Sequence, residues 1–284
     1  MSWQILIGIS VILGSINSLL HRGLLKNENS DAYAQSVVFT FLEGIFSLII
    51  IAASGRHLSV LHGEQLPIFI SIALLSPLVF IFMFKGFKLI GASEHSIILT
   101  SSKIWAILGA ILFLRETPTI TKLIGALLII FGVILTQWKK ERLKLNNGAI
   151  YVLLAAFFIA VNQTLAYFLL RNFDVLSFMV YNSLAASVLL FIFKPKIVTK
   201  FNFYFKIKNL VNILFSSLND GLANIFTFFA YQIGRNALQI GPLGATGIPL
   251  TVILAIIFLG ERERLNQKVI GSLAALAGSI LLIR

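Results

Sequence analysis

SIILTSSKIWAILGAILFLRE at 96–116 and LIGALLIIFGV at 123–133 decide how this chain of 284 residues folds, because the pattern returns later. The second occurrence is QIGPLGATGIPLTVILAIIFLGE at 239–261, followed by VIGSLAALAGS at 269–279. In each, an apolar run ends at a glutamate, a short polar loop follows, and a second apolar run carries two glycines. A bilayer core needs about 20 helical residues to cross it. The pattern therefore predicts a pair of membrane-spanning helices that occurs twice.

The composition indicates the same environment. Hydrophobic residues make up 58% of the chain and charged residues only 12%, about half the charged share of a soluble domain. Such a chain cannot cover a soluble globule with polar residues, and it is too apolar to be disordered. Cysteine is absent, which excludes a disulfide framework, a thiol nucleophile and a thiolate metal site. The net charge of +12 lies mostly between apolar runs, so it indicates membrane topology and no nucleic-acid partner.

Ten apolar runs are long enough to be membrane helices. Their approximate limits are 3–20, 34–53, 66–88, 95–114, 120–138, 149–170, 175–193, 210–233, 237–259 and 266–283. Strands of a membrane barrel would alternate polar and apolar residues, and these runs do not. We therefore expect an all-α integral membrane protein with ten transmembrane helices joined by short connections.

The two halves of the chain repeat at an offset of about 145 residues. Corresponding positions share a residue type, namely Ala92 and Ala237, Asn17 and Asn162, Glu116 and Glu261, and Gly125 and Gly132 with Gly271 and Gly278. We expect one five-helix repeat over 1–145 and a second over 146–284. Because five is an odd number of spans, the second repeat is predicted to lie inverted in the membrane. Inverted repeats are typical of secondary transporters.

Taken together, the two paired motifs, the ten runs and the length of the chain resemble the EamA-type drug/metabolite transporters. The resemblance covers nearly the whole chain. It implies a secondary transporter or exporter of small metabolites, with a central cavity lined mainly by spans 1, 3, 4, 6, 8 and 9. The first half departs from the family pattern, since Ile104 stands where the second half has Pro249, and Arg115 where it has Gly260.

The orientation in the membrane has two readings. Sixteen of the 23 Lys and Arg residues lie in loops that follow odd-numbered spans, and six lie at the termini or in the other loops. Basic loops stay in the cytoplasm, so this count places both termini outside. The family resemblance implies cytoplasmic termini instead. The bacterial or archaeal inner (cell) membrane is the expected location.

Three ionisable side chains lie near the middle of predicted spans: Glu43, Lys103 and Asp220. A charge at this depth costs at least about 2.5–3.5 kcal/mol on insertion scales, so such residues usually have a partner or a function. Lys103 is a candidate anchor for a carboxylate or phosphate, and a structural ion pair with Glu43 or Asp220 is the alternative. A carboxyl buried at low dielectric can bind a proton near neutral pH, which makes Asp220 and Glu43 candidates for proton coupling.

Polar and aromatic neighbours complete the candidate substrate site. Asn219 and Asn224 flank Asp220, which suggests a segment that lines a substrate path or is locally unwound. The matching Asn17 and Asn162 either flank a ligand from both halves or join helices by hydrogen bonds. Further candidates are Gln163, a polar neighbour in span 6, and Trp105, which either stacks on cargo or packs. Glycines and prolines break the start of span 9, where a packing kink is the favoured reading: Gly241, Pro242, Gly244, Gly247 and Pro249.

These features favour a secondary active transporter that exports or exchanges a small polar metabolite by alternating access, with proton coupling. Lys103 with Asp220 or Glu43 would suit a zwitterion such as an amino acid. The alternatives are a flippase for a lipid-linked substrate and a membrane scaffold. No enzyme motif of the DxxD, HExxH, GxSxG or P-loop type occurs, and we expect no metal or cofactor. The expected partners are a small-molecule substrate and the lipid bilayer; a monomer suffices, and a dimer stays open.

Overall fold

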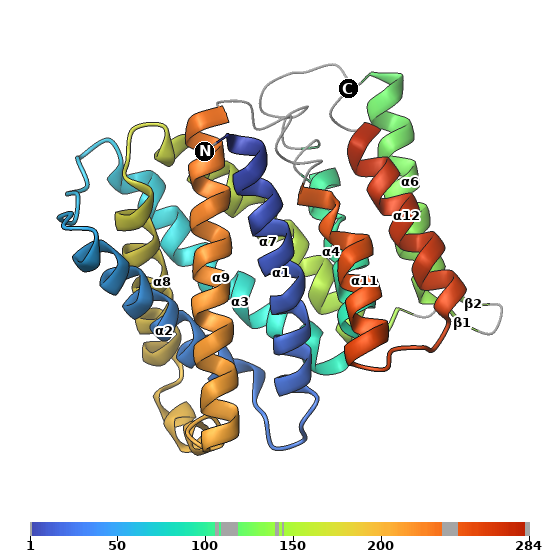
Figure 1. The fold of residues 1–284 in the computed structure, drawn as a ribbon, viewed down its shortest axis with the longest axis horizontal. Helices are drawn as coiled ribbons and strands as arrows, with labels where there is room; N and C mark the ends of the chain where they lie inside the picture. Colours follow the sequence, from blue (N-terminus) through green and yellow to red (C-terminus); the bar gives the residue numbers. More distant parts are fainter. Residues whose placement is uncertain are drawn as a thin grey trace.

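The computed structural model describes residues 2–105, 108, 119–139, 142–143, 145–234 and 244–281. Figure 1 shows their helical arrangement. The α-helices are α1 (Trp3–Leu25), α2 (Ala32–Ala53), α3 (Leu66–Leu89), α4 (Ala92–Leu99), α6 (Ile120–Gln137), α7 (Asn147–Leu170), α8 (Val175–Phe193), α9 (Ile207–Gly234), α11 (Gly247–Phe258) and α12 (Leu265–Leu281). A 3₁₀ helix, η1 (Pro195–Phe203), joins α8 to α9, and two antiparallel two-residue strands, β1 (Trp138–Lys139) and β2 (Arg142–Leu143), lie between α6 and α7.

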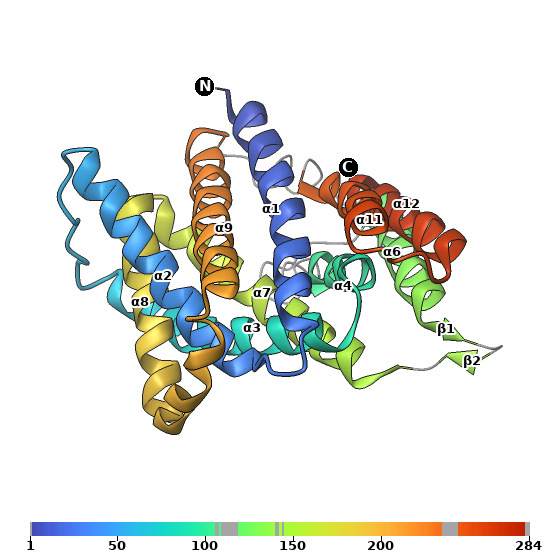
Figure 2. The same ribbon diagram turned by 60° about the horizontal axis from the view of Figure 1, so that its bottom comes forward.

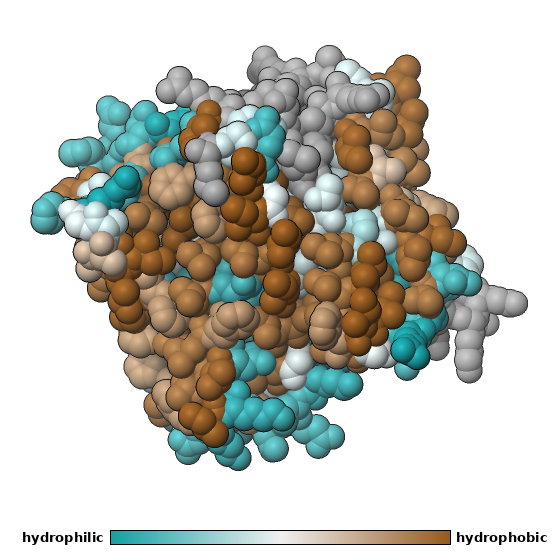
Figure 3. Space-filling view, in the orientation of Figure 1, coloured by the Kyte–Doolittle hydropathy of each residue, from teal (hydrophilic) through white to brown (hydrophobic). Residues whose placement is uncertain are grey.

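The helices have the length and the surface of membrane spans. Among the described residues, α1, α2, α3, α7, α8 and α9 are each long and apolar enough to cross a bilayer. Shorter apolar helices lie at Leu123–Leu135, Gly247–Phe258 and Leu265–Leu281. Figure 3 shows apolar surface across the middle of one face and hydrophilic residues gathered at the lower end of the molecule. The all-helical membrane architecture predicted from the sequence is therefore confirmed.

Several helices begin at a side chain that caps them. Asp31 accepts hydrogen bonds from the backbone N–H groups of Tyr33 and Ala34 at the start of α2. Asn146 accepts from a backbone N–H in the first turn of α7, and Asp174 does so in the first turn of α8. The first N–H groups of a helix have no partner within it, so these caps fix where the three helices start.

The helices pack in pairs that reflect the repeat. We number the halves so that α1, α2, α3, α4 and α6 correspond to α7, α8, α9, α11 and α12. Helix α1 packs on α9, and α7 packs on α3, which is the same contact with the halves exchanged. Helices α2 and α8 pack on each other, as do α6 and α12, and α4 and α11. Figure 2 shows α2, α8 and α9 on one side of α1, and α4, α6, α11 and α12 on the other.

Four glycines let α6 and α12 approach closely. A methyl carbon placed on Gly132 would lie 2.6 Å from the carbonyl oxygen of Gly271. A methyl carbon on Gly278 would lie 2.5 Å from the carbonyl oxygen of Gly125. These are the glycines that correspond between the halves, and the two contacts are reciprocal. Small residues at a membrane helix crossing allow backbones to touch, which is the contact seen here.

Both halves contain a broken helix at the same register. Helix α4 ends at Leu99, Thr100 and Ser101 form a turn, and the chain is helical again over 102–105. In the second half, residues 244–245 are helical, Thr246 is a turn and α11 begins at Gly247. The turn thus interrupts the span expected over 95–114, of which residues 106, 107 and 109–114 lie outside the described residues. The backbone N–H groups of Thr100 and Ser101 donate to the carbonyls three residues earlier, so the helix tightens where it ends.

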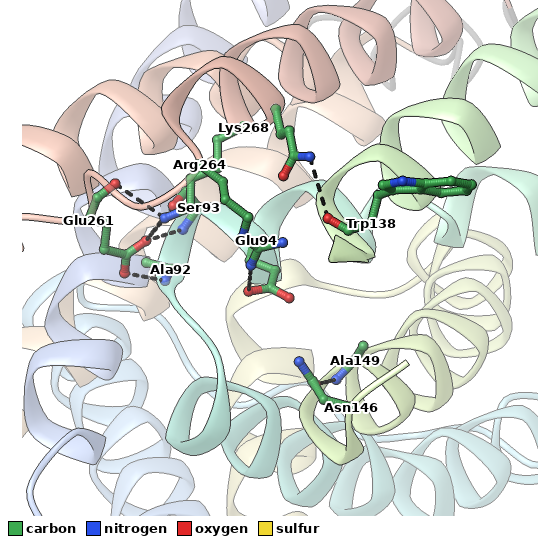
Figure 4. Close-up of polar contacts among 10 residues, drawn as sticks. Ala92, Ser93, Glu94, Trp138, Asn146, Ala149, Glu261, Arg264 and Lys268 are labelled. Atoms are coloured by element: carbon green, nitrogen blue, oxygen red, sulfur yellow. Dashed lines mark hydrogen bonds and ion pairs between the residues drawn. The ribbon is translucent and has the colours of Figure 1, made fainter. Parts of the chain in front are cut away.

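A carboxylate from the second half caps the broken helix of the first. Figure 4 shows Glu261, in the loop after α11, accepting hydrogen bonds from the backbone N–H groups of Ala92 and Ser93 at 2.7 and 3.2 Å. The Ser93 hydroxyl also donates to this carboxylate, and Lys268 Nζ lies 3.3 Å from it. A side chain on Gly91 would collide with the Glu261 carboxylate, which lies 2.5 Å from where its Cβ would be. Glu261 thus ties the start of α4 to the α11–α12 loop.

The electrostatics of Glu261 follow from these contacts. Burial raises the pKa of its carboxyl group, but the hydrogen bonds from Ser93, the charge of Lys268 and the backbone N–H groups of Ala92 and Ser93 outweigh burial. The net effect holds the pKa of Glu261 below its ordinary value of 4.5. The carboxylate therefore stabilises the fold when it is ionised.

The glycine crossing can be tested by adding one methyl group. Gly132→Ala should lower the free energy of unfolding by about 1–3 kcal/mol, because the backbone of Gly271 must move away. The matched control is Gly8→Ala in α1, where no atom lies within 4 Å of the added carbon. Thermal unfolding in detergent measures both variants. Equal melting temperatures for the two alanine variants would contradict the close crossing.

The Glu261 contact predicts a pH-dependent stability. The pKa of Glu261 is lower in the folded than in the unfolded chain, so its contribution is present above pH 4.5 and is lost as the pH falls further. At pH 7, Glu261→Gln should lower the free energy of unfolding by about 1.5–3 kcal/mol and so lower the melting temperature. The difference in melting temperature between the variant and the wild type should become smaller below pH 4.5. The control is Glu263→Gln, an exposed carboxylate in the same loop, and a gap that persists unchanged at pH 4 would refute the assignment.

Candidate functional site

A cavity of about 320 Å³ lies between α1, α4, α7, α9 and α11. We call the end of the bundle at which α1 begins the N-terminal end, and the end at which α4 begins the far end (Figure 1). The cavity reaches from the two helix breaks toward the N-terminal end, since its walls include Ile7 near the start of α1 and Tyr231 near the end of α9. Hydroxyl groups line it densely, from Ser10, Ser15, Ser18, Ser96, Thr100, Ser102, Thr227 and Thr251.

Lys103 and Gln163 are the predicted site residues that line this cavity. Lys103 follows the break in the first half directly, so the break presents it to the cavity wall. Within the described ranges, Lys103 Nζ makes no hydrogen bond or ion pair, and none joins it to Glu43 or Asp220. Neither carboxylate is a lining residue. The cavity therefore holds a cation whose charge no described side chain balances.

A second cavity of about 560 Å³ adjoins the first at the N-terminal end. Its lining residues are Tyr167, Leu170, Arg171, Asn172, Tyr231 and Gln232. Tyr231 lines both cavities, and its ring centroid lies 5.9 Å from that of Tyr167. The sequence did not single out Arg171 or Tyr231, because an arginine at a helix end and a tyrosine in an apolar run are ordinary features of membrane helices.

The two buried carboxylates form a cluster with amide and hydroxyl donors. Asn224 Nδ2 donates to both Asp220 Oδ2 and Glu43 Oε1, at 3.1 Å each. Asn17 Nδ2 donates to Asp220 Oδ1 at 2.8 Å, and Ser183 Oγ donates to Glu43 Oε2 at 3.0 Å. Helices α1, α2, α8 and α9 each contribute at least one of these residues. The structure thus brings together Glu43, Asp220, Asn224 and Asn17 from the predicted set.

The cluster continues to His21 and Gln35, which the sequence reading did not include. Asn17 Nδ2 lies 3.0 Å from His21 Nε2, and the Gln35 amide lies 3.2 Å from His21 Nδ1. His21 is 3% exposed, and its ring packs against three phenylalanines, Phe39, Phe84 and Phe87. A neutral imidazole carries one donor and one acceptor nitrogen, so only one of the two amide NH2 groups can donate to the ring.

Asn17 and Asn162 occupy equivalent places in the packing of the two halves. Asn17 on α1 donates to Asp220 on α9, and Asn162 on α7 donates to Ser76 on α3 at 2.9 Å. The two contacts are the same interaction with the halves exchanged, but only one of them ends on an acid. Both asparagines join helices, and neither lines the cavity.

Of the predicted break in span 9, Gly244 and Gly247 line the cavity, and the remaining predicted site residues lie outside its walls. Asn219 Nδ2 donates to the backbone carbonyl of Leu13 at 2.6 Å, which ties α9 to α1. Trp105 is 41% exposed and packs edge-on against Phe157. Gly241 and Pro242, in the predicted break of span 9, lie outside the described residues. Over the ranges that the structure describes, no group of three or more His, Asp or Glu residues could hold a metal ion.

Comparison with known proteins agrees with this architecture. One protein of known crystal structure aligns over 98% of this chain and 95% of its own, with a TM-score of 0.65 at 14% identity, which shows a shared fold. No curated protein matches the sequence. The model of the EamA-like transporter family matches twice, over residues 1–138 and 146–284. These two matches span nearly the whole chain, and the protein therefore belongs to the EamA-like transporter family.

Proposed function

We propose that this protein is a secondary active transporter that moves a small polar metabolite by alternating access. The observation that carries the proposal is the cavity between the two broken helices, which is lined by hydroxyl groups and Lys103. We propose that Glu261, through its bonds to the start of α4, closes the far end. The cavity walls come from both halves of the chain, and its 320 Å³ volume fits a small solute. Broken helices at matching positions of two repeats mark the substrate site in many transporters.

The exchange of contacts between the halves supports alternating access. The repeats are proposed to be the five-helix units 1–145 and 146–284, which together supply ten spans. Each half places its first helix on the third helix of the other half. If one half adopts the arrangement of the other, the closed far end becomes the open end. Glu261 holds the far end shut in the present state through its bonds to the first turn of α4.

The carboxylate cluster supplies a site for coupling to protons. Glu43 and Asp220 share the single Asn224 amide, and among the described residues neither forms an ion pair with Lys or Arg. Two carboxylates held this close in a low-dielectric interior can hold a proton between them. The cluster lies beside the cavity, because Asp220 precedes the cavity-lining Thr227 by about two turns of α9. A change in the tilt of α9 would therefore move the carboxylate cluster and the cavity wall together.

The coupling proposal predicts a specific loss in one variant. Wild-type protein in sealed vesicles should accumulate a small metabolite when a pH gradient is imposed, and a pH dye in the vesicles should report proton movement. Asp220→Asn keeps the size of the side chain and one acceptor oxygen but cannot bind or release a proton. It should lose gradient-driven accumulation by about tenfold or more, while exchange of labelled for unlabelled solute at equal pH continues.

The matched control is Asp174→Asn. Asp174 caps α8 and pairs with Arg56 at the N-terminal end, outside both cavities. Its amide variant should keep pH-driven accumulation. Full accumulation by Asp220→Asn would remove the carboxylate cluster from the coupling mechanism, and equal loss in both variants would make the effect one of stability.

A further inference from the structure

We propose that the transported metabolite is a compact organic anion with a carboxylate or phosphate group. Arg171 first binds this anion in the cavity at the end of α7, and Lys103 then binds it in the cavity between the helix breaks. This inference rests on the proposed transport function and assigns its substrate class. It also assigns Arg171 and Tyr231 to the path of the solute. The outer cavity is the one at the end of α7, and the inner cavity is the one between the helix breaks.

The two cavities form one path along α7 and α9. Ile159 and Gln163 line the inner cavity, and Tyr167 and Arg171 line the outer one. These four residues are spaced by four, so they lie on one face of α7. Eight residues at 1.5 Å rise place Arg171 about 12 Å from Gln163 along the axis. On α9, Tyr231 lines both cavities, and we infer that a solute moving from one to the other passes this side chain.

The charges on this path are all of one sign. Among the described lining residues, Lys103 and Arg171 are cations, and none is a carboxylate. Neither cation forms an ion pair within the described part of the chain. Three other described cations do form ion pairs, namely Arg56 with Asp174, Arg264 with Glu94 and Lys268 with Glu261. A cavity walled by unbalanced cations attracts and binds anions.

Arg171 is held in place without using its hydrogen-bond donors. Its guanidinium carbon lies 4.8 Å from the ring centroid of Tyr167 and 5.1 Å from that of Phe168. Gln232 Nε2 donates to the carbonyl of Leu170, the last residue of α7, and to that of Phe173 in the following loop, at 2.9 and 3.0 Å. Arg171 is therefore not needed as a helix cap. Its planar donors suit a carboxylate or phosphate.

The charge pattern favours an anion over a zwitterion. A zwitterion would need a carboxylate in the cavity wall to balance its ammonium group. Glu43 and Asp220 are instead bonded to Asn17, Asn224 and Ser183 beside the cavity. The hydroxyl groups around Lys103 can bond to the neutral part of a solute, and the volume limits that part to a small skeleton. Lys103 then binds the charged group as a point charge.

Binding and uptake of charge-matched solutes test the proposal. The probes are lactate and glycerol 3-phosphate as anions, alanine as a zwitterion and choline as a cation. The purified protein in detergent, without lipid headgroups, should be stabilised against heating by at least one anion and not by alanine or choline. Lys103→Gln should weaken that binding by about tenfold or more, because it removes a buried charge at the bound solute. Lys85→Gln, in α3 and outside both cavities, is the control.

Arg171→Gln should lower the rate of anion uptake more than the affinity for the anion. Uptake of the anion into vesicles should slow by about tenfold, and the dependence of uptake on salt should weaken, while the binding constant changes less. Arg56→Gln is the control, since Arg56 lies at the same end but pairs with Asp174. Arg171→Gln uptake equal to that of Arg56→Gln would overturn the role of the outer cavity.

The remaining outcomes separate this inference from the proposed function. Uptake of alanine or choline with the anions inert would overturn the anion assignment and leave transport intact. Anion binding unchanged in Lys103→Gln would remove Lys103 from the site. A folded wild-type protein that binds and moves none of the four probes would contradict both the assignment and the transport proposal.

Discussion

The constraint on which this structure depends is that polar groups inside a bilayer must find their partners within the protein. No water is present there to bond them, so an unsatisfied group costs several kcal/mol. The chain meets this demand at depth by joining helices through side-chain bonds, of which the Asn17–Asp220 and Asn162–Ser76 contacts are the paired examples. Lys103 lies in the wall of a cavity, and no described side chain balances its charge. We therefore assign the binding of substrate to this cavity.

The same symmetry that builds the fold creates the cavity. The reciprocal glycine contacts between α6 and α12 hold the halves together at one side of the bundle. The breaks at Thr100–Ser101 and at Thr246 face each other across the cavity, since both α4 and α11 line it and pack on one another. The halves differ where chemistry is needed: one asparagine contact ends on the acid Asp220 and the other on Ser76. The two halves thus share one arrangement of helices, but only one half places an acid at the asparagine contact.

Much of the fold was predictable from the sequence, and less of the site. The paired glycines marked the internal repeat, and the structure shows that the helices that carry them cross at Gly132 and Gly271. The depth of Glu43 and Asp220 marked them, but nothing in the sequence shows that they share Asn224. The sequence did not predict the break at Thr100, because the segment 96–105 contains no glycine or proline. The sequence placed Glu261 at the end of an apolar run, and its bond to α4 depends on an approach between segments 168 residues apart.

The most direct test of the account is the side from which the cavity can be reached. The chain has no cysteine, so Ser102→Cys places a single thiol in the cavity wall. In sealed membranes of one orientation, a membrane-impermeant maleimide should react with this thiol from the side of the N-terminal end only. Adding Glu261→Gln, which weakens the closure of the far end, should make the thiol reactive from the opposite side. Equal reaction from both sides in the parent protein, or an unchanged side after Glu261→Gln, would contradict alternating access.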